Sequence, residues 1–150
     1  MRQKTLIVLL LGSPLLAACR GSSPAPPLLD NSGGRPPEPP PTATLTVTDP
    51  SGAVGPFAIV DLERLVLNLD GGNLSVGAHP VRIDVTSPGG TLYAQIPATL
   101  VANDQHQGRA TSALQVRGSV IEGFSEAGTW QLVANVDGAP LASASVDLTE

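Results

Sequence analysis

From residue 43 onward, apolar and polar residues alternate in short runs that end at turns rich in glycine, proline and aspartate. This period of two is typical of β-strands with one buried face. The pattern predicts seven strands, at Thr44–Thr48, Leu65–Leu69, Val81–Val85, Leu92–Ile96, Leu114–Val116, Trp130–Val136 and Ala142–Leu148. Short strands separated by turn signals at near-regular intervals predict an all-β, antiparallel sandwich over residues 43–150.

The pattern leaves three details of these strands open. Residues 98–102 either continue the fourth strand beyond a bulge or begin another strand, and Val120 is a candidate end of the fifth. The segment Phe57–Leu69 has room for a short helical turn before its strand. The last two strands flank Asp137-Gly138, residue types that accept positive φ, so these strands are expected to form a hairpin.

The run Glu126-Ala127-Gly128-Thr129-Trp130-Gln131-Leu132 resembles the D-x-G-x-Y-x-C stretch that opens strand F of immunoglobulin-like domains. Trp130 stands at the position of the corner tyrosine, and Leu132 at the position of the second cysteine. The resemblance implies an immunoglobulin-like sandwich in which the Trp130 ring caps the core. It implies no particular activity, because such sandwiches host many functions.

Residues 20–42 are unlike the sandwich, because eight of these 23 residues are proline and no hydrophobic period is present. Such a composition predicts a disordered, partly polyproline spacer with a reach of at most roughly 70 Å. The alternative is a proline-rich ligand for a partner domain, for which Arg35–Pro41 is the best match. We therefore divide the chain into residues 1–18, 19–42 and 43–150.

The first 18 residues have the layout of a secretory signal peptide, with Arg2 and Lys4 before the apolar run Leu6–Leu11. The run is too short to span a membrane. Leu16-Ala17-Ala18-Cys19 resembles the lipobox of bacterial lipoproteins, whose pattern is Leu, a small residue, Gly or Ala, then Cys. The resemblance implies that lipoprotein signal peptidase recognises Leu16, Ala17 and Ala18 and cuts before Cys19.

The lipobox also implies that the Cys19 thiol carries diacylglyceryl and that the new N-terminus is acylated further, for example with palmitate. Two or three chains on one residue suffice for stable anchoring. By the sorting rule of enteric bacteria, Arg20 after the cysteine favours the outer membrane over the inner. The expected location is the bacterial cell envelope.

Composition excludes several partners and cofactors. Cys19 is the only cysteine, which leaves no internal or intermolecular disulfide once it is lipidated and no zinc site built on paired cysteines. Removal of residues 1–18 takes away two of the eight positive charges and leaves 13 negative ones, a formal charge of −7. Nucleic acid is not an expected partner, because binding phosphates needs clustered lysine and arginine.

Candidate chemistry in the sandwich is sparse. His106 follows Asp104 in a polar loop and reads as a solvated loop residue, while His79 before Pro80 reads as a turn residue. No nucleophile elbow or metal-ligand spacing is present, so no catalytic, metal or cofactor-binding residue is assigned. Loop acids could bind calcium, but turns favour Asp in any case; these acids are Asp49, Asp70 and Asp137. Tyr93 is expected to face outward, as the only candidate for glycan stacking.

These observations predict a lipid-anchored, non-enzymatic binding or structural module. Its partners are the membrane, through the lipid, and another envelope protein. Strand edges or the loops 70–79 and 103–109 would contact that protein. The alternative is a carbohydrate-binding or enzymatic accessory domain that uses His106 and the neighbouring acids.

Overall fold

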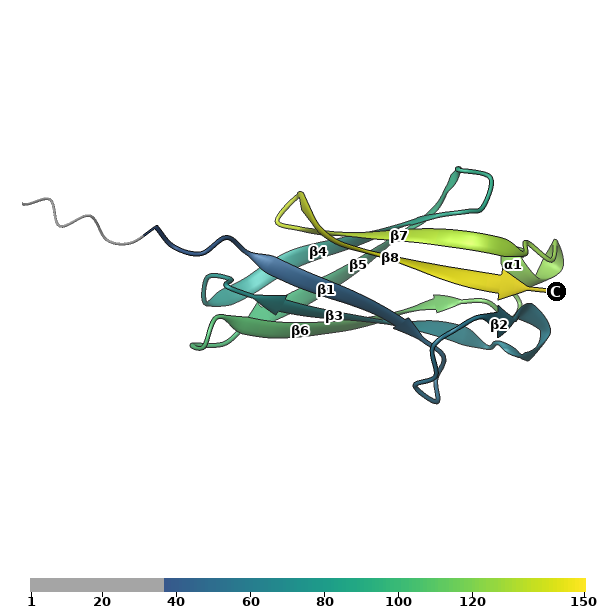
Figure 1. Ribbon diagram of the computed structural model, residues 1–150, viewed down its shortest axis with the longest axis horizontal. Coiled ribbons are helices and arrows are strands. Elements are labelled where there is room, and N and C mark those ends of the chain that lie inside the picture. Colours follow the sequence, from purple (N-terminus) through teal and green to yellow (C-terminus); the bar gives the residue numbers. More distant parts are fainter. Residues whose placement is uncertain (1–36) are drawn as a thin grey trace, which may run out of the picture. The chain divides into compact units, whose positions relative to one another are not determined.

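The alternating segments pair into eight strands in the computed structural model, which describes residues 37–150 (Figure 1). The predicted signal peptide, Cys19 and most of the predicted linker lie outside the described residues. The elements are β1 Thr42–Thr48, β2 Phe57–Ala58, the 3-10 helix η1 Ile59–Asp61, β3 Arg64–Gly72, β4 Gly77–Thr86, β5 Leu92–Ala102, β6 Gln107–Gln115, α1 Val120–Gly123, β7 Gly128–Val136 and β8 Ala139–Thr149. No helix in residues 37–150 is long and apolar enough to cross a bilayer.

The strands follow the order β1-β3-β6-β5-β4-β7-β8-β2, and every pair is antiparallel except β2 with β8. β5 pairs with β4 along its length but with β6 only at Val101↔Arg109 and Ala102↔Gly108. The continuous ladder therefore folds into two layers, β1-β3-β6 and β5-β4-β7-β8 (Figure 1). This is the order of immunoglobulin-like sandwiches, so the predicted fold class is confirmed.

The core lies between the two layers and consists of the apolar positions of each alternating run. Leu65, Leu67 and Leu69 of β3 are fully buried, as are Trp130 and Leu132 of β7. Complete burial of a large aliphatic side chain stabilises the folded state by about 1.5–3 kcal/mol. The same alternation that predicts the strands therefore supplies the main stabilising force.

Trp130 occupies the corner position of β7 as the resemblance implies. Its ring is fully buried, and its indole N–H donates to the backbone carbonyl of Glu126 at 3.1 Å. A corner tyrosine makes the corresponding bond, from its hydroxyl to the backbone a few residues upstream. The indole thus replaces the phenol and ties the segment before β7 to the core.

β5 corrects the expected orientation of Tyr93. The β4–β5 pairing shifts register between Val85 and Thr86, which pair with Ala94 and Leu92 and leave Tyr93 as an extra residue. Tyr93 consequently turns inward and packs edge-on against Trp130, with ring centroids 5.2 Å apart. Leu92 is the exposed neighbour. A bulge moves the side chains beyond it to the other face, which alternation alone could not show.

The details left open at the sequence level are decided as follows. Residues 98–102 continue β5 as one strand, and the helical turn before β3 is present as η1. Val120 does not extend β6, because it begins α1 after the N-cap Ser119, whose hydroxyl accepts the Ile121 N–H at 3.2 Å. The Ser119-x-x-Glu122 spacing is a capping-box signal that predicts such a helix start.

The alternating strand directions give the sandwich two ends. The linker-side end holds residues 37–41, the loops 73–76 and 103–106, and the turn at 137–138. The far end holds the loops 49–56 and 87–91 together with β2, η1 and α1 (Figure 1). These two names are used below.

Candidate functional site: loops of the linker-side end

The two loops expected to contact a partner, 70–79 and 103–109, lie against each other at the linker-side end. The Leu74 N–H donates to the His106 carbonyl at 3.2 Å, and His106 Nδ1 donates to the Leu74 carbonyl at 2.8 Å. Within the second loop, Asn103 Oδ1 accepts the backbone N–H groups of Gln105 and Gln107. His106 is exposed in a loop, as expected, and its hydrogen bonds join the two loops.

A buried histidine connects a third segment to this cluster. His79 lies inside β4 with 6% of its surface exposed, so its assignment as a turn residue is wrong. Its Nδ1 is 2.6 Å from Asp137 Oδ2 in the β7–β8 turn, and its Nε2 is 2.8 Å from the Ser75 carbonyl oxygen. We call His79, Ser75 and Asp137 the histidine clasp. Only the pairing of β4 with β7 brings these residues together.

The histidine clasp favours a charged imidazole. Both ring nitrogens face acceptors, so both carry protons when the two bonds are made. The Ser75 carbonyl, followed by the Asp137 carboxylate, raises the pKa of His79 above its ordinary value, while burial opposes this shift. The protonated form of His79 thus donates to an acceptor in each of two loops.

Ser75, His79 and Asp137 are the residue types of a nucleophilic triad, but their geometry differs from one. Ser75 Oγ is 3.5 Å from His79 Nε2, farther than the Ser75 carbonyl oxygen at 2.8 Å. An Nε2 that donates to a carbonyl has no lone pair with which to take the hydroxyl proton. The arrangement orders loops rather than activating a serine.

Beside the histidine clasp is a depression of about 350 Å³, lined on one side by residues 38–41 of the predicted linker. Asn73 Nδ2 donates to the Pro40 carbonyl oxygen at 3.2 Å, which holds the end of the linker against the loops. Glu38 and Asp137 contribute the carboxylates of this depression. The linker-side end therefore includes the first described residues as well as three loops.

The loop acids considered for calcium are far apart and differently engaged. Asp49, at the far end, accepts Ser51 Oγ–H and the N–H groups of Ser51 and Ala53, and the Ser51 hydroxyl is the main cause that lowers the pKa of Asp49. Asp70 lies inside β3 rather than in a loop and pairs with Arg109 at 2.6 Å, and Asp137 belongs to the histidine clasp. Within residues 37–150, no three metal-ligating side chains gather.

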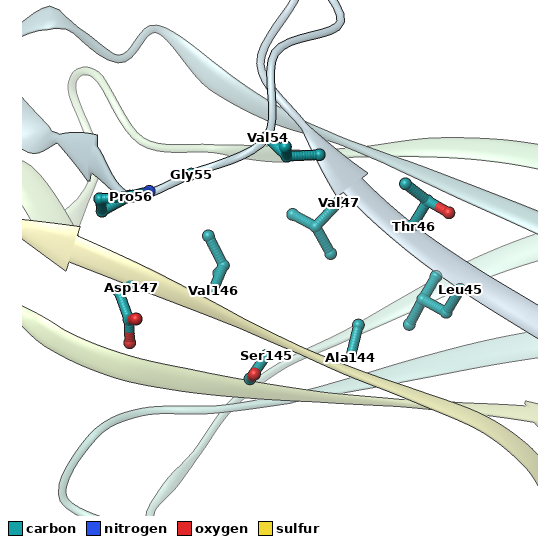
Figure 2. A pocket seen from close by; sticks show the side chains of 10 residues that line it. All are labelled: Leu45, Thr46, Val47, Val54, Gly55, Pro56, Ala144, Ser145, Val146 and Asp147. Carbon is teal, nitrogen blue, oxygen red and sulfur yellow. The ribbon is translucent and has the colours of Figure 1, made fainter.

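A second surface feature is a groove of about 290 Å³ between β1 and β8 (Figure 2). These strands lie side by side without pairing to each other in the described part of the chain. Figure 2 shows Val47 of β1 and Val146 of β8 on the two sides, with Val54 near its rim. The groove combines buried apolar side chains with strand edges that β-augmentation can use.

The residues predicted for lipidation and peptidase recognition, Cys19 and Leu16, Ala17 and Ala18, lie outside the described residues. Asp104, the other half of the suggested Asp104–His106 pair, makes no hydrogen bond to His106, whose Nδ1 is directed to Leu74. The residues that sequence reasoning missed are Ser75 and His79, because the signal that links them to Asp137 is the strand order.

Several solved structures are similar in fold, whereas no protein-family model and no curated protein sequence matches the chain. An immunoglobulin-like protein from Pseudomonas aeruginosa matches 75% of this chain over 98% of its own length, with 12% identity and a TM-score of 0.44. The CARDB domain of a Pyrococcus furiosus protein, solved with di-metal ions, matches 75% of this chain over 90% of its own, with 16% identity and a TM-score of 0.45.

The DNA glycosylase AlkC of Pseudomonas fluorescens, solved bound to DNA, shares 19% identity with a TM-score of 0.46. This match covers 73% of the present chain but only 30% of the glycosylase. These three similarities concern the sandwich fold alone.

Proposed function

We propose that this protein is a lipid-anchored component of the bacterial cell envelope, held by acylated Cys19, whose immunoglobulin-like domain is a non-enzymatic module that binds another envelope protein. The lipobox Leu16–Cys19 and the preceding signal layout support the anchor. The proline-rich segment that follows would separate the domain from the bilayer by up to roughly 70 Å. Arg20 after the cysteine supports the outer membrane as the site of anchoring.

The engagement of both histidines is the observation that carries the non-enzymatic part of the proposal. His79 donates from both ring nitrogens to protein acceptors, and His106 uses Nδ1 to join two loops. Each imidazole thus has a structural task that competes with proton transfer to a substrate. Tyr93, the residue considered for sugar stacking, packs against Trp130 instead.

The anchor is tested by feeding cells a clickable fatty acid and separating membrane from soluble fractions. We expect the wild-type chain to be labelled and to sediment with membranes, and Cys19→Ser to lose both properties. Ala18→Gly is the matched control, because the lipobox pattern accepts glycine at this position, so its labelling should persist. A Cys19→Ser protein that is processed normally and stays in the membrane fraction would refute the anchor.

The non-enzymatic role is tested separately from the anchor. We expect Asp104→Ala and His106→Ala to leave the cellular phenotype of the wild type intact, provided that thermal melts show a folded domain. Loss of the phenotype in both folded variants would favour the enzymatic or carbohydrate-binding alternative.

A further inference from the structure

The far end of the sandwich displays the most exposed aromatic side chain of the described residues. Phe124 is 77% exposed, Val120 one helical turn earlier is 51% exposed, and Val60 on η1 is 66% exposed. η1 packs against α1, and Arg117 Nη2 reaches the Val60 carbonyl oxygen at 3.5 Å. We call Phe124, Val120 and Val60 the apolar tip.

The backbone that carries the apolar tip is fixed by a buried side chain and by hydrogen bonds. Ile121, between the exposed positions of α1, is fully buried, and the Phe124 N–H donates to the Val120 carbonyl at 3.0 Å. The backbone of Glu126 is fixed twice, because its N–H donates to Ile121 and its carbonyl accepts the Trp130 indole. A side chain presented by such a fixed turn loses little conformational freedom on binding, which favours affinity.

Four acidic residues lie on the same two turns and their flanks, and one of them, Glu122, accepts the Gly118 N–H at 2.6 Å; these are Asp61, Glu63, Glu122 and Glu126. One carboxylate oxygen of Glu126 is buried without a hydrogen-bond partner among the described residues. Two arginines lie in the same region, Arg64 at 3.6 Å from Glu63 and Arg117 with its guanidinium at 3.5 Å from the Val60 carbonyl, so these four acids and two arginines carry a formal charge of −2. Residues 37–150 as a whole contain four arginines and twelve acidic side chains, a formal charge of −8.

We propose that the apolar tip is the docking surface for the protein partner, and that this partner offers an apolar socket rimmed by lysine or arginine. The proposal rests on the binding function proposed above and names where binding occurs. Exposed aromatic residues are the usual centres of protein interfaces, and complementary charge around them speeds association. The first described residues, 37–41, lie at the opposite end of the sandwich and do not cover the apolar tip.

The negative charge of the domain distinguishes between three possible binding partners of the apolar tip: a second copy of the chain, a membrane and another protein. A second copy of the chain would bring the same acidic side chains face to face, and like charges across an interface oppose binding. An anionic leaflet would repel a domain with a formal charge of −8. A protein surface with an apolar socket and a cationic rim complements both the apolar centre and the acidic residues around it.

The test begins with p-benzoylphenylalanine incorporated at position 124 of the full chain in cells, followed by irradiation. Position 92 is the matched control, because Leu92 is 53% exposed at the start of β5, two strands away from β7 in the sheet. The protein captured from position 124 is then purified and titrated against wild type, Phe124→Ser and Leu92→Ser. We expect Phe124→Ser to weaken binding by about 30-fold or more, as for an interface hot spot, and Leu92→Ser to have little effect.

The acidic rim is tested with the same captured protein. Asp61→Asn should lower the association rate and its dependence on salt, whereas Asp104→Asn at the linker-side end should not. Equal weakening by Phe124→Ser and Leu92→Ser, or an affinity independent of salt, would overturn the proposal. Adducts only with a second copy, or binding of the unlipidated Cys19→Ser chain to vesicles of phosphatidylglycerol, would overturn it in favour of self-association or membrane contact.

Failure of this proposal is distinguishable from failure of the proposed anchor. Loss of fatty-acid labelling concerns Cys19 and does not affect a titration of the purified chain. Absence of any adduct from position 124 in a labelled, membrane-bound protein would refute only the docking surface.

Discussion

The linker-side end and the far end are built from turns between the same strands, but they use their side chains differently. At the linker-side end, buried His79 and the paired segments at Leu74 and His106 join three loops by hydrogen bonds. At the far end, Phe124 and Val60 remain exposed although the turns that carry them are anchored in the core.

This difference shows that one sandwich can use one end to order its own loops and the other end to expose side chains to a partner protein. Polar groups buried at the linker-side end stabilise the folded domain because each forms a hydrogen bond within it. An exposed phenyl ring contributes little to folding, but it becomes favourable when a partner buries it. The following variants test this contrast, from the largest expected effect to the smallest.

Trp130→Ala should have the largest effect on stability, because it removes a fully buried indole and its bond to the Glu126 carbonyl. We expect a loss of about 3–5 kcal/mol in the free energy of unfolding, measured by urea denaturation. Trp130→Phe, which keeps an aromatic ring but not the N–H, is the control and should lose less. A loss below about 1 kcal/mol for Trp130→Ala would contradict the corner role of Trp130.

Asp137→Asn tests the histidine clasp at the linker-side end. Asparagine accepts the positive φ of 52° at this turn, so the turn is kept while the buried imidazole of His79 loses its carboxylate partner. We expect a loss of about 1–2 kcal/mol near pH 6. Asp104→Asn, a neutralised acid in an exposed loop of the same end, should change stability by less than about 0.5 kcal/mol. Equal effects of the two variants would show that Asp137 matters only as a surface charge.

The pH dependence of stability should depend on His79. Its pKa is raised in the folded state, so its contribution is fully present below the unfolded value of about 6.5 and is lost as pH rises through the folded pKa. The carboxylates that face it are Asp137 from the β7–β8 turn and Glu38 across the depression. The neutral imidazole still donates one bond, so only part of the contribution of the histidine clasp is lost.

Urea denaturation between about pH 6 and about pH 9 measures this effect, and NMR titration of the His79 imidazole assigns it. His79→Gln should flatten the stability profile. A profile that keeps the wild-type slope in His79→Gln would show that another group is responsible.

Phe124→Ser should have the smallest effect on stability, within about 0.5 kcal/mol of wild type, because the ring is 77% exposed. Together with Trp130→Ala, this variant contrasts two aromatic side chains six positions apart. Urea denaturation of both proteins under the same conditions gives the comparison. A large destabilisation by Phe124→Ser would show that the ring supports the fold and would remove the premise of the docking surface.

Much of the fold follows from local signals. Each of the seven predicted strands overlaps an observed one, because alternation reports which side chains face the core, and the Asp137-Gly138 turn forms the expected hairpin. The bounds predicted for β6 are wrong, because it runs from Gln107 to Gln115 and so begins seven residues before the predicted Leu114–Val116 strand. The orientation of Tyr93 could not be derived in this way, since the bulge that turns it inward depends on the pairing of β5 with β4. The start of α1 had a local signal in Ser119 and Glu122 that the strand pattern obscured.

The sequence by itself determined the strand-forming segments, the acidic character of the domain and the lipobox that predicts an anchor, because each is a property of neighbouring residues. Only the tertiary structure brought His79 to Asp137, which are 58 positions apart, and placed η1 beside α1. Contacts of this kind depend on the order in which strands pair. For that reason the histidine clasp and the apolar tip became visible only in the folded domain.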